Sequence, residues 1–395
     1  MRRPMSAAAL LVVGVLPAAG ADVPLEAAPP AADYVQTCPV FGNRFLSIDG
    51  GETCVRLGGY VRGEIGIGSQ YINRIDTKRN NDIAFGARSL ILYDARTVTE
   101  VGTLQTFASI RFEDVSLRGT VDTGTRVDLE RGFVSWAGLT AGKAKSAFDY
   151  DINYSFFGSR ADDQSTLLIN YTYYLPNGFF VVGSLEDPTA RQGDLVGASG
   201  KRTPQHAGSR MPDLVAAFGQ ESGIYFWKLS GAYMQMRART PRDTTHNGFA
   251  GRAVVEVDLP SGEGRDRLGV AVAAGNGAGS YVGFDDDIDG FVARGRFDAS
   301  VGYSGIVSLD HYWSERWSSA FTLFAGQVDR SKSTGEGDRT VAVAAANLVW
   351  HPVDGFYMGG ELQYYYDKNA PGQSTRTHDN VDHDLYGLFR IQRSF

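Results

Sequence analysis

The last thirteen residues of the chain, His383 to Phe395, repeat with a period of two. Alternate positions, read back from the end, form a mostly apolar face: Phe395, Arg393, Ile391, Phe389, Gly387 and Leu385. The intervening positions are mostly polar. This period is that of a β-strand with one face in an apolar and the other in a polar environment. The segment alone would also suit the last strand of a soluble β-sandwich, so the rest of the chain must decide.

Segments with the same alternation fill most of the chain. We predict sixteen strands, at residues 55–71, 83–97, 103–114, 126–136, 139–147, 167–175, 179–186, 213–221, 224–236, 247–259, 266–275, 306–313, 317–327, 340–350, 356–367 and 383–395. Short turns alternate with longer loops rich in Gly, Asp and Ser. One turn, Pro176-Asn177-Gly178, is a strong hairpin signal. The insert at residues 187–212 shows no apolar period, and we interpret it as an external loop.

The first residues have the composition of a secretory signal. Arg2 and Arg3 precede a short apolar run, which ends at the small residues Ala19-Gly20-Ala21. We therefore expect a signal peptide at 1–21, a periplasmic N-terminal segment at 22–54 and a single β-domain at 55–395. No later stretch reaches 18 apolar residues, so we expect no transmembrane helix in the mature chain.

Composition agrees with strands that face lipid on one side and water on the other. The chain has 48 Gly, 19 Tyr and 22 Phe, and its mean hydropathy is only −0.20. Loss of the signal peptide changes the formal charge from −7 to −9. This acidic balance argues against nucleic acid as a partner.

Strands can cross a bilayer only as a closed barrel, because every backbone polar group in lipid must be paired. We therefore predict an all-β fold, a sixteen-stranded antiparallel transmembrane β-barrel in the bacterial outer membrane. A barrel of this size encloses a lumen too wide for side chains to fill, so water would occupy it. Aromatic residues concentrate toward strand ends, as interfacial girdles require. The terminal Phe395 is typical of the signal that such barrels present to the barrel assembly machinery.

Residues 290–301 also alternate, and they are the one ambiguous segment. A seventeenth strand would place the two chain ends on opposite sides of the membrane. Single-chain bacterial barrels have even strand counts as a rule. We therefore assign this segment to a long sixth loop.

Two cysteines, Cys38 and Cys54, lie just before the first predicted strand. In an exported protein we expect them to pair as a structural disulfide. A metal site would need further ligands nearby, and no histidine occurs in the first 200 residues.

Several stretches resemble the general porins of alphaproteobacteria, and together they cover essentially the whole mature chain. They are CPVFGNRFLSIDGGETCVRLGGYVRGE, DARTVTEVGTL, FVSWAGLTAGKAKSAFD, SLEDPT, MPDLVA, DHYW, ANLVWHPVDGFYMGGELQY and the terminal strand. The resemblance implies a homotrimer of sixteen-stranded barrels that passes small hydrophilic solutes passively, with an inward-folded third loop as a constriction. Lys143 and Lys145 depart from the family, which more often has Arg and a neutral polar residue there. That departure puts the selectivity in doubt.

If the third loop is residues 148–163, it brings a set of acidic side chains toward the lumen: Asp149, Asp151, Asp162 and Asp163. The first five strands carry the basic side chains that we expect on the facing wall: Arg62, Arg88, Arg111, Arg131, Lys143 and Lys145. Opposite charges across a narrow gap would screen solutes by charge and size. The alternative is that these acids are solvated loop charges and the basic residues merely line the lumen.

Other motifs are weaker. Asp285, Asp287 and Asp289 copy the start of a calcium-binding EF-hand loop, but Arg296 stands where a bidentate Glu is needed. An external acidic loop with at most loose cation binding is favoured. The six histidines are scattered and hydrolase motifs are missing, so we expect no enzyme and no cofactor, although Asp310-His311 leaves a barrel hydrolase as an alternative.

Expected partners are the bilayer and lipopolysaccharide. A substrate-selective channel and an adhesin are the remaining alternatives to a passive channel. An energy-coupled transporter is disfavoured because the segment before the first strand is too short for a plug domain.

Overall fold

The computed structural model describes residues 35–42, 44–48, 51–68, 83–115, 125–157, 164–197, 202–203, 208–238, 244–261, 266–284, 287–293, 296–334, 337–369 and 381–395. The expected signal peptide, Asp162, Asp163 and Asp285 lie outside these residues. Among the described residues, no helix is long and apolar enough to cross a membrane.

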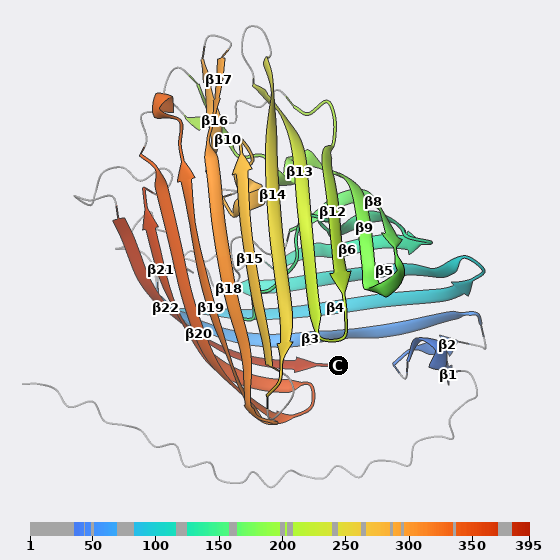
Figure 1. The fold of residues 1–395 in the computed structure, drawn as a ribbon. Helices are drawn as coiled ribbons and strands as arrows, with labels where there is room; N and C mark the ends of the chain where they lie inside the picture. Colours follow the sequence, from blue (N-terminus) through green and yellow to red (C-terminus); the bar gives the residue numbers. More distant parts are fainter. Residues whose placement is uncertain are drawn as a thin grey trace, which may run out of the picture.

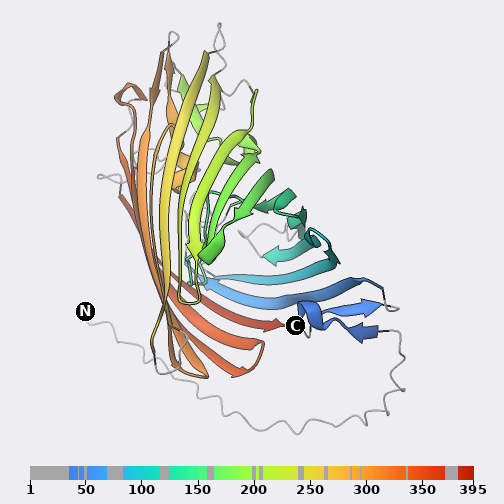
Figure 2. The same ribbon diagram turned by 45° about the vertical axis from the view of Figure 1, so that its right-hand side comes forward.

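Sixteen antiparallel strands form a closed barrel (Figures 1 and 2). They are β3 (Thr53–Ile67), β4 (Ile83–Thr99), β5 (Gly102–Val115), β6 (Arg126–Trp136), β7 (Leu139–Lys145), β8 (Ser165–Tyr174), β9 (Phe179–Glu186), β12 (Asp213–Glu221), β13 (Tyr225–Ala238), β14 (Thr244–Leu259), β15 (Asp266–Asn276), β18 (Val301–Ser314), β19 (Trp317–Asp329), β20 (Arg339–Val353), β21 (Phe356–Lys368) and β22 (Val381–Ser394). Each pairs with the next along this series, so the predicted strand number and topology are confirmed.

The terminal strand closes the barrel. β22 pairs with β3 from Gly387 opposite Ile67 to Ser394 opposite Tyr60. Phe395 and Gly59 then exchange two backbone hydrogen bonds, with N···O distances of 3.0 and 3.2 Å. No strand edge is left at this seam, which is the condition that lipid imposes on a sheet.

The alternation predicted for β22 separates the two faces of the wall. Leu385 is 65% exposed, whereas Arg390 is buried. Outward side chains are thus apolar and exposed, and this is the arrangement that lipid stabilises.

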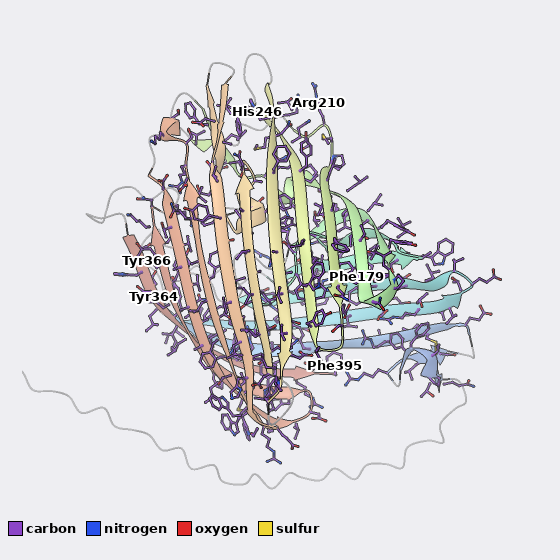
Figure 3. All side chains as sticks on the ribbon, in the orientation of Figure 1. Phe179, Arg210, His246, Tyr364, Tyr366 and Phe395 are labelled. Carbon is purple, nitrogen blue, oxygen red and sulfur yellow. A yellow bond between two sulfur atoms is a disulfide. The ribbon has the colours of Figure 1, made fainter. Side chains whose placement is uncertain are left out.

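Short turns gather at one end of the barrel, and Phe179 and Phe395 lie nearer this end in Figure 3. The β8–β9 turn contains η3 (Pro176–Gly178), in which Asn177 and Gly178 have φ of 61° and 77°. A Cβ on Gly178 would lie 2.0 Å from the carbonyl oxygen of Glu221, so only glycine fits. Arg210 and His246 mark the opposite end, where the long connections lie.

Two of the long connections form a separate four-stranded sheet, which we call the inner sheet. It consists of β10 (Asp194–Gly197), β11 (Arg202–Thr203), β16 (Ile288–Ala293) and β17 (Arg296–Ala299), in the order β11-β10-β16-β17. β16 and β17 occupy the ambiguous segment at 290–301, which is therefore not a strand of the barrel wall, as predicted, although Val301 begins β18. Residues 187–212, interpreted as an external loop, connect β9 to β12 and contribute β10 and β11 to this sheet, with Leu195 and Val196 fully buried.

Cys38 and Cys54 form the predicted disulfide. It joins the hairpin β1 (Val35–Thr37) and β2 (Leu46–Ile48) to the start of β3. Phe45 is buried beside the bond, and the guanidinium carbons of Arg56 and Arg96 lie 5.2 and 4.9 Å from its ring centre. Besides the disulfide, the hairpin is held by the pairing of β2 with β3 and by these two arginines.

Replacing both cysteines by serine should release this hairpin and leave the barrel intact. A disulfide that closes a loop of this length contributes about 3 kcal/mol to folding stability, because it restricts the unfolded chain. We expect proteolysis before β3 to become fast, while the thermal unfolding temperature of the barrel stays unchanged. Loss of the folded barrel would instead show that the disulfide is needed for closure at the β22–β3 seam.

Candidate functional site: the lumen wall and its inner segment

The expected basic wall carries its own counter-charges. Arg62 and Arg88 lie directly opposite each other on β3 and β4, and like charges in such a pair repel. Arg62 donates to the Gln392 amide oxygen at 2.9 Å, and Arg88 forms a 3.1 Å ion pair with Glu113. The arginines of this wall are thus held apart by neighbours on the wall itself.

The remaining expected basic residues lie on β5, β6 and β7. Arg111 donates to Asp128 at 3.0 Å, and the Lys143 ammonium lies 3.6 Å from the same carboxylate. By register, Arg131 is opposite Ser109, Lys143 is opposite Leu167 and Lys145 is opposite Ser165. Lys143 thus shares the Asp128 counter-charge with Arg111 of the neighbouring wall.

The chain after β7, residues 146–157, contacts inward-facing side chains of distant strands; we call it the inner segment. Lys228 of β13 donates to the backbone oxygens of Ala147 and Asp149, at 3.1 and 2.5 Å. Glu256 of β14 accepts hydrogen bonds from the hydroxyls of Tyr150 and Tyr154, at 3.3 and 2.5 Å. Burial of the two hydroxyls, followed by the adjacent Glu256 charge, raises the pKa of both tyrosines.

The far end of the inner segment is held by β21 and β22. Both oxygens of the Glu361 carboxylate accept backbone N–H groups, from Phe156 at 2.5 Å and Phe157 at 2.8 Å. Arg390 donates to the Phe156 carbonyl at 3.1 Å, with its guanidinium carbon 4.4 Å from the Phe156 ring centre. Glu361 and Arg390, hereafter the clamp, therefore hold one end of a segment whose other end leaves β7.

Asp149 is an anchor of the inner segment. It is buried and lies 2.5 Å from Arg191 and 3.5 Å from Arg252, neither of which the sequence singled out. Burial lowers the pKa of Arg191, but the Asp149 charge and other neighbours outweigh it, so its pKa is raised and its charge is retained. Asp151 is exposed, and its carboxylate accepts the Asn153 N–H at 3.0 Å. The two expected loop acids thus have different surroundings.

The inner sheet fills one side of the lumen with apolar side chains. Leu195 and Val292 belong to a buried cluster with Met234 and Met236 of β13. Phe148 of the inner segment and Tyr281 of η5 (Gly279–Val282) complete it, with ring centres 4.9 Å apart. The inward face of the barrel is therefore apolar in part, which the alternation along the strands did not predict. The only signal was the short apolar stretch at 195–196 and the alternation at 290–301.

The aspartates of the EF-hand-like stretch that are described bind protein groups. Asp287 lies 2.8 Å from Arg330 and 3.3 Å from Arg339. Asp289 accepts backbone N–H groups of Gly193 and Gly279, at 2.8 and 2.9 Å. Within the described residues, no group of three or more potential metal ligands occurs. The stretch thus joins the inner sheet to the wall through ion pairs.

The raised pKa of Asp289 should make the stability of the inner sheet depend on pH. Burial, only partly offset by the two backbone hydrogen bonds, raises its pKa from 3.8 to about 7. The folded state therefore binds more protons than the unfolded state between about pH 4 and pH 7, so stability falls as the pH rises through this window. We expect amide hydrogen exchange in β10 and β16, corrected for intrinsic rates, to gain protection at pH 5 relative to pH 8. Asp289→Asn should remove the difference, and a pH dependence that survives in this variant would assign it to another group.

Both side chains of the Asp310-His311 pair contact neighbouring side chains. The His311 Nδ1 lies 2.5 Å from Asp266, and the ring meets Trp313 edge-on at 4.3 Å. Asp310 instead lies 3.5 Å from Arg267.

Comparison with known proteins places these features in a family. A model described as "Porin subfamily" matches residues 22–387. The chain is 31% identical to the porin Omp2b of Brucella neotomae, over 99% of this chain and 98% of that protein. In fold it is similar to the outer membrane channel DcaP of Acinetobacter baumannii, with a TM-score of 0.69, 15% identity and coverage of 87% of this chain and 97% of the other. It is also similar to OmpT of Vibrio cholerae in its trimer form, with a TM-score of 0.53, 12% identity and coverage of 87% and 100%.

Proposed function

The chain belongs to the porin subfamily, and from this we propose that it is a passive channel of the bacterial outer membrane for small hydrophilic solutes and ions. Members of this family are channels, and we propose no catalytic role for the scattered histidines. Homotrimer formation is part of the proposal, because OmpT, which shares the fold, is described as a trimer.

We propose further that the inner segment forms the constriction of the channel. One observation supports this above the others: the segment leaves β7 and is hydrogen-bonded to β21 and β22 at its far end. β7 and β21 are separated in the barrel by the strands from β8 to β20 on one side and from β22 to β6 on the other. A chain that joins them must cross the lumen and narrow it.

Charge selection in this proposal comes from both sides of the remaining opening. On one side is the wall formed by Arg62, Arg88, Arg111 and Arg131 with its counter-charges. On the other is Asp151; Asp162 and Asp163, which the sequence also predicts for the constriction, lie outside the described residues. Charged groups placed in this way act on ions through the narrow water-filled gap, where screening by bulk solvent is reduced.

The test is conductance of the detergent-folded protein in a planar bilayer. We expect current steps that close in thirds under voltage, with a conductance proportional to salt concentration. A correctly folded barrel that gives no steps would exclude a passive channel, and the external loops would then be the place to look for an adhesive function. Association with lipopolysaccharide and recognition of Phe395 by the assembly machinery are further proposals, which rest on the outward apolar faces and the terminal strand.

A further inference from the structure

Four aromatic rings form a continuous row on the barrel wall. The ring centres of Tyr312 on β18 and His351 on β20 are 6.3 Å apart, and those of His351 and Tyr357 on β21 are 6.0 Å apart. Phe156 of the inner segment continues the series, 6.0 Å from Tyr357. We call these four residues the aromatic row. It extends from the short turn between β20 and β21 to the end of the inner segment that the clamp holds.

Register places the aromatic row inside the barrel. Tyr312 lies opposite Ser318, which is buried, whereas the preceding Trp317 is exposed on the outside. The His351 Nε2 lies 2.9 Å from the same Ser318 hydroxyl, so the two rings share one face of the wall. Tyr357 donates to the Gln392 amide oxygen at 3.1 Å, as does Arg62 of the lumen wall. The row therefore faces the lumen.

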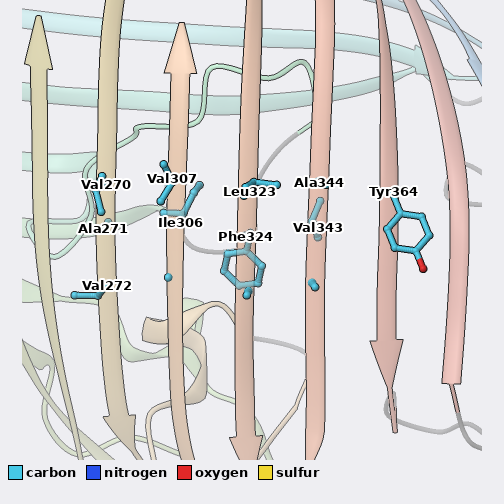
Figure 4. Close-up of a pocket in the computed structure, with 13 residues that line it drawn as sticks. Val270, Ala271, Val272, Ile306, Val307, Leu323, Phe324, Val343, Ala344 and Tyr364 are labelled. Atoms are coloured by element: carbon cyan, nitrogen blue, oxygen red, sulfur yellow. The ribbon is translucent and has the colours of Figure 1, made fainter. Parts of the chain in front are cut away.

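The outer face of the same strands has a different apolar surface. A groove of about 500 Å³ lies there across β15 and β18 to β21, and its lining is almost entirely hydrocarbon, including Val272, Leu323 and the ring of Tyr364 (Figure 4). Lipid tails suit that groove, because it offers them few polar groups. The rings of the aromatic row have water on their open side instead, so they need another explanation.

The rings of the row leave part of their faces uncovered. Two of the three neighbouring pairs are inclined by only 25° and 30°. Nearly parallel rings with centres 6 Å apart are offset, because full overlap brings the centres closer together. Tyr150 and Phe226 show such overlap elsewhere in the lumen, with centres 3.9 Å apart and an inclination of 12°. All four residues of the row are accordingly only half-buried.

Polar groups beside the row can both donate and accept hydrogen bonds. They are the Ser318 and Tyr357 hydroxyls, the His351 ring and the Gln392 amide. Charged side chains near the two ends are paired with each other, Asp310 with Arg267 at 3.5 Å and Arg390 with Glu64 at 2.6 Å. The row thus combines open ring faces with hydrogen-bonding groups and carries no carboxylate or guanidinium of its own.

We propose that the aromatic row binds neutral oligosaccharides inside the channel. A pyranose has C–H faces that pack on aromatic rings and bury apolar surface, and each of its hydroxyls both donates and accepts hydrogen bonds. Successive sugar units can contact successive rings, so a short chain is retained longer than a single sugar. The inference rests on the proposed channel function and names a class of solute that the channel retains during passage.

The test is block of single-channel current by cellotetraose, a short chain of β-linked glucose. We expect brief interruptions whose frequency rises with sugar concentration and saturates. Tyr312→Leu removes a ring that is distant from the clamp, and we expect it to weaken the block about three- to tenfold. Tyr357→Leu should have a similar effect, whereas Tyr357→Phe keeps the ring and should retain the wild-type block. Each block is expressed relative to the variant's own open current.

A matched control is Phe107→Leu on another arc of the wall. Phe107 of β5 lies opposite the buried Asp94, stacks on Phe133 with ring centres 5.2 Å apart and is half-buried like the rings of the row. This variant should bind the sugar as the wild type does. A polyethylene glycol of matching size, which has no ring faces, should reduce the current of every variant by the same fraction.

A wild-type channel that carries salt current but is not interrupted by cellotetraose would overturn the proposal and leave the channel function standing. Equal block in the wild type, Tyr312→Leu and Tyr357→Leu would also overturn it, as would an equal loss in Phe107→Leu. A folded barrel without salt current would refute the channel function instead. Calorimetric titration of the detergent-folded protein with cellotetraose would then decide the sugar site by itself, with Tyr312→Leu expected to weaken binding and an absence of binding refuting the site.

Discussion

Glu361→Gln should release the far end of the inner segment and make the channel noisy and wider. The carboxylate accepts two backbone N–H groups, and hydrogen bonds to a charged group contribute about 1.5–3 kcal/mol each. A glutamine has one acceptor oxygen, and its amide nitrogen would face an N–H donor. Because 1.4 kcal/mol corresponds to a factor of ten, the released state should become about ten to a hundred times more populated. Single-channel recording would detect it as frequent steps to a higher conductance.

A matched control for this experiment is Glu113→Gln. Glu113 is also a carboxylate of the wall, but its ion pairs are with Arg88 and Arg111, and among the described residues it forms no hydrogen bond or ion pair with the inner segment. This variant should alter ion selectivity without adding conductance steps. If Glu361→Gln conducts with the step size and noise of the wild type, the clamp does not hold the constriction.

Asp149→Asn is expected to destabilise the protein, whereas Asp151→Asn should change which ions pass. Asp149 is buried between two arginines, and removing one partner of a buried ion pair typically costs about 3–5 kcal/mol. Asp151 is exposed, so its neutralisation should shift the reversal potential toward anions. Thermal unfolding in detergent and the reversal potential under a salt gradient measure the two effects separately.

Asp151→Asn should unfold at the same temperature as the wild type, and it therefore serves as the control for Asp149→Asn. An unchanged reversal potential in that variant would remove Asp151 from the constriction. An Asp149→Asn variant as stable as the wild type would show that Arg191 and Arg252 are held by other groups. Before the structure, the sequence predicted one role for both acids, namely charge selection.

Most of the fold could be predicted from the sequence, because the strands of a barrel in lipid follow a local pattern of alternating apolar and polar residues. Alternation in segments such as β22 predicts which side chains face outward, and each turn signal sets where a strand ends. The count of strands followed, as did the assignment of residues 290–301 to a loop. The disulfide was predictable because an exported chain with two cysteines has one pairing.

Few of the residues that form the candidate site could be predicted from the sequence. Arg191, Arg252, Glu361 and Arg390 are far from the inner segment in sequence, and no spacing or motif connects them to it. The buried inner sheet escaped detection because its strands are short and β10 pairs in parallel with a segment almost a hundred residues away. The alternation at 290–301 is visible in the sequence, but nothing in it identifies residues 194–197 as the neighbouring strand.

The sequence by itself determined the all-β class and the sixteen-stranded barrel. These follow from the period-two pattern and from the requirement that every backbone group in lipid be paired. Only the tertiary structure decided which acids of the inner segment are buried and which carboxylate holds its end. Those outcomes depend on contacts between strands that are distant in the chain, and burial, rather than residue type, determines what each charge does.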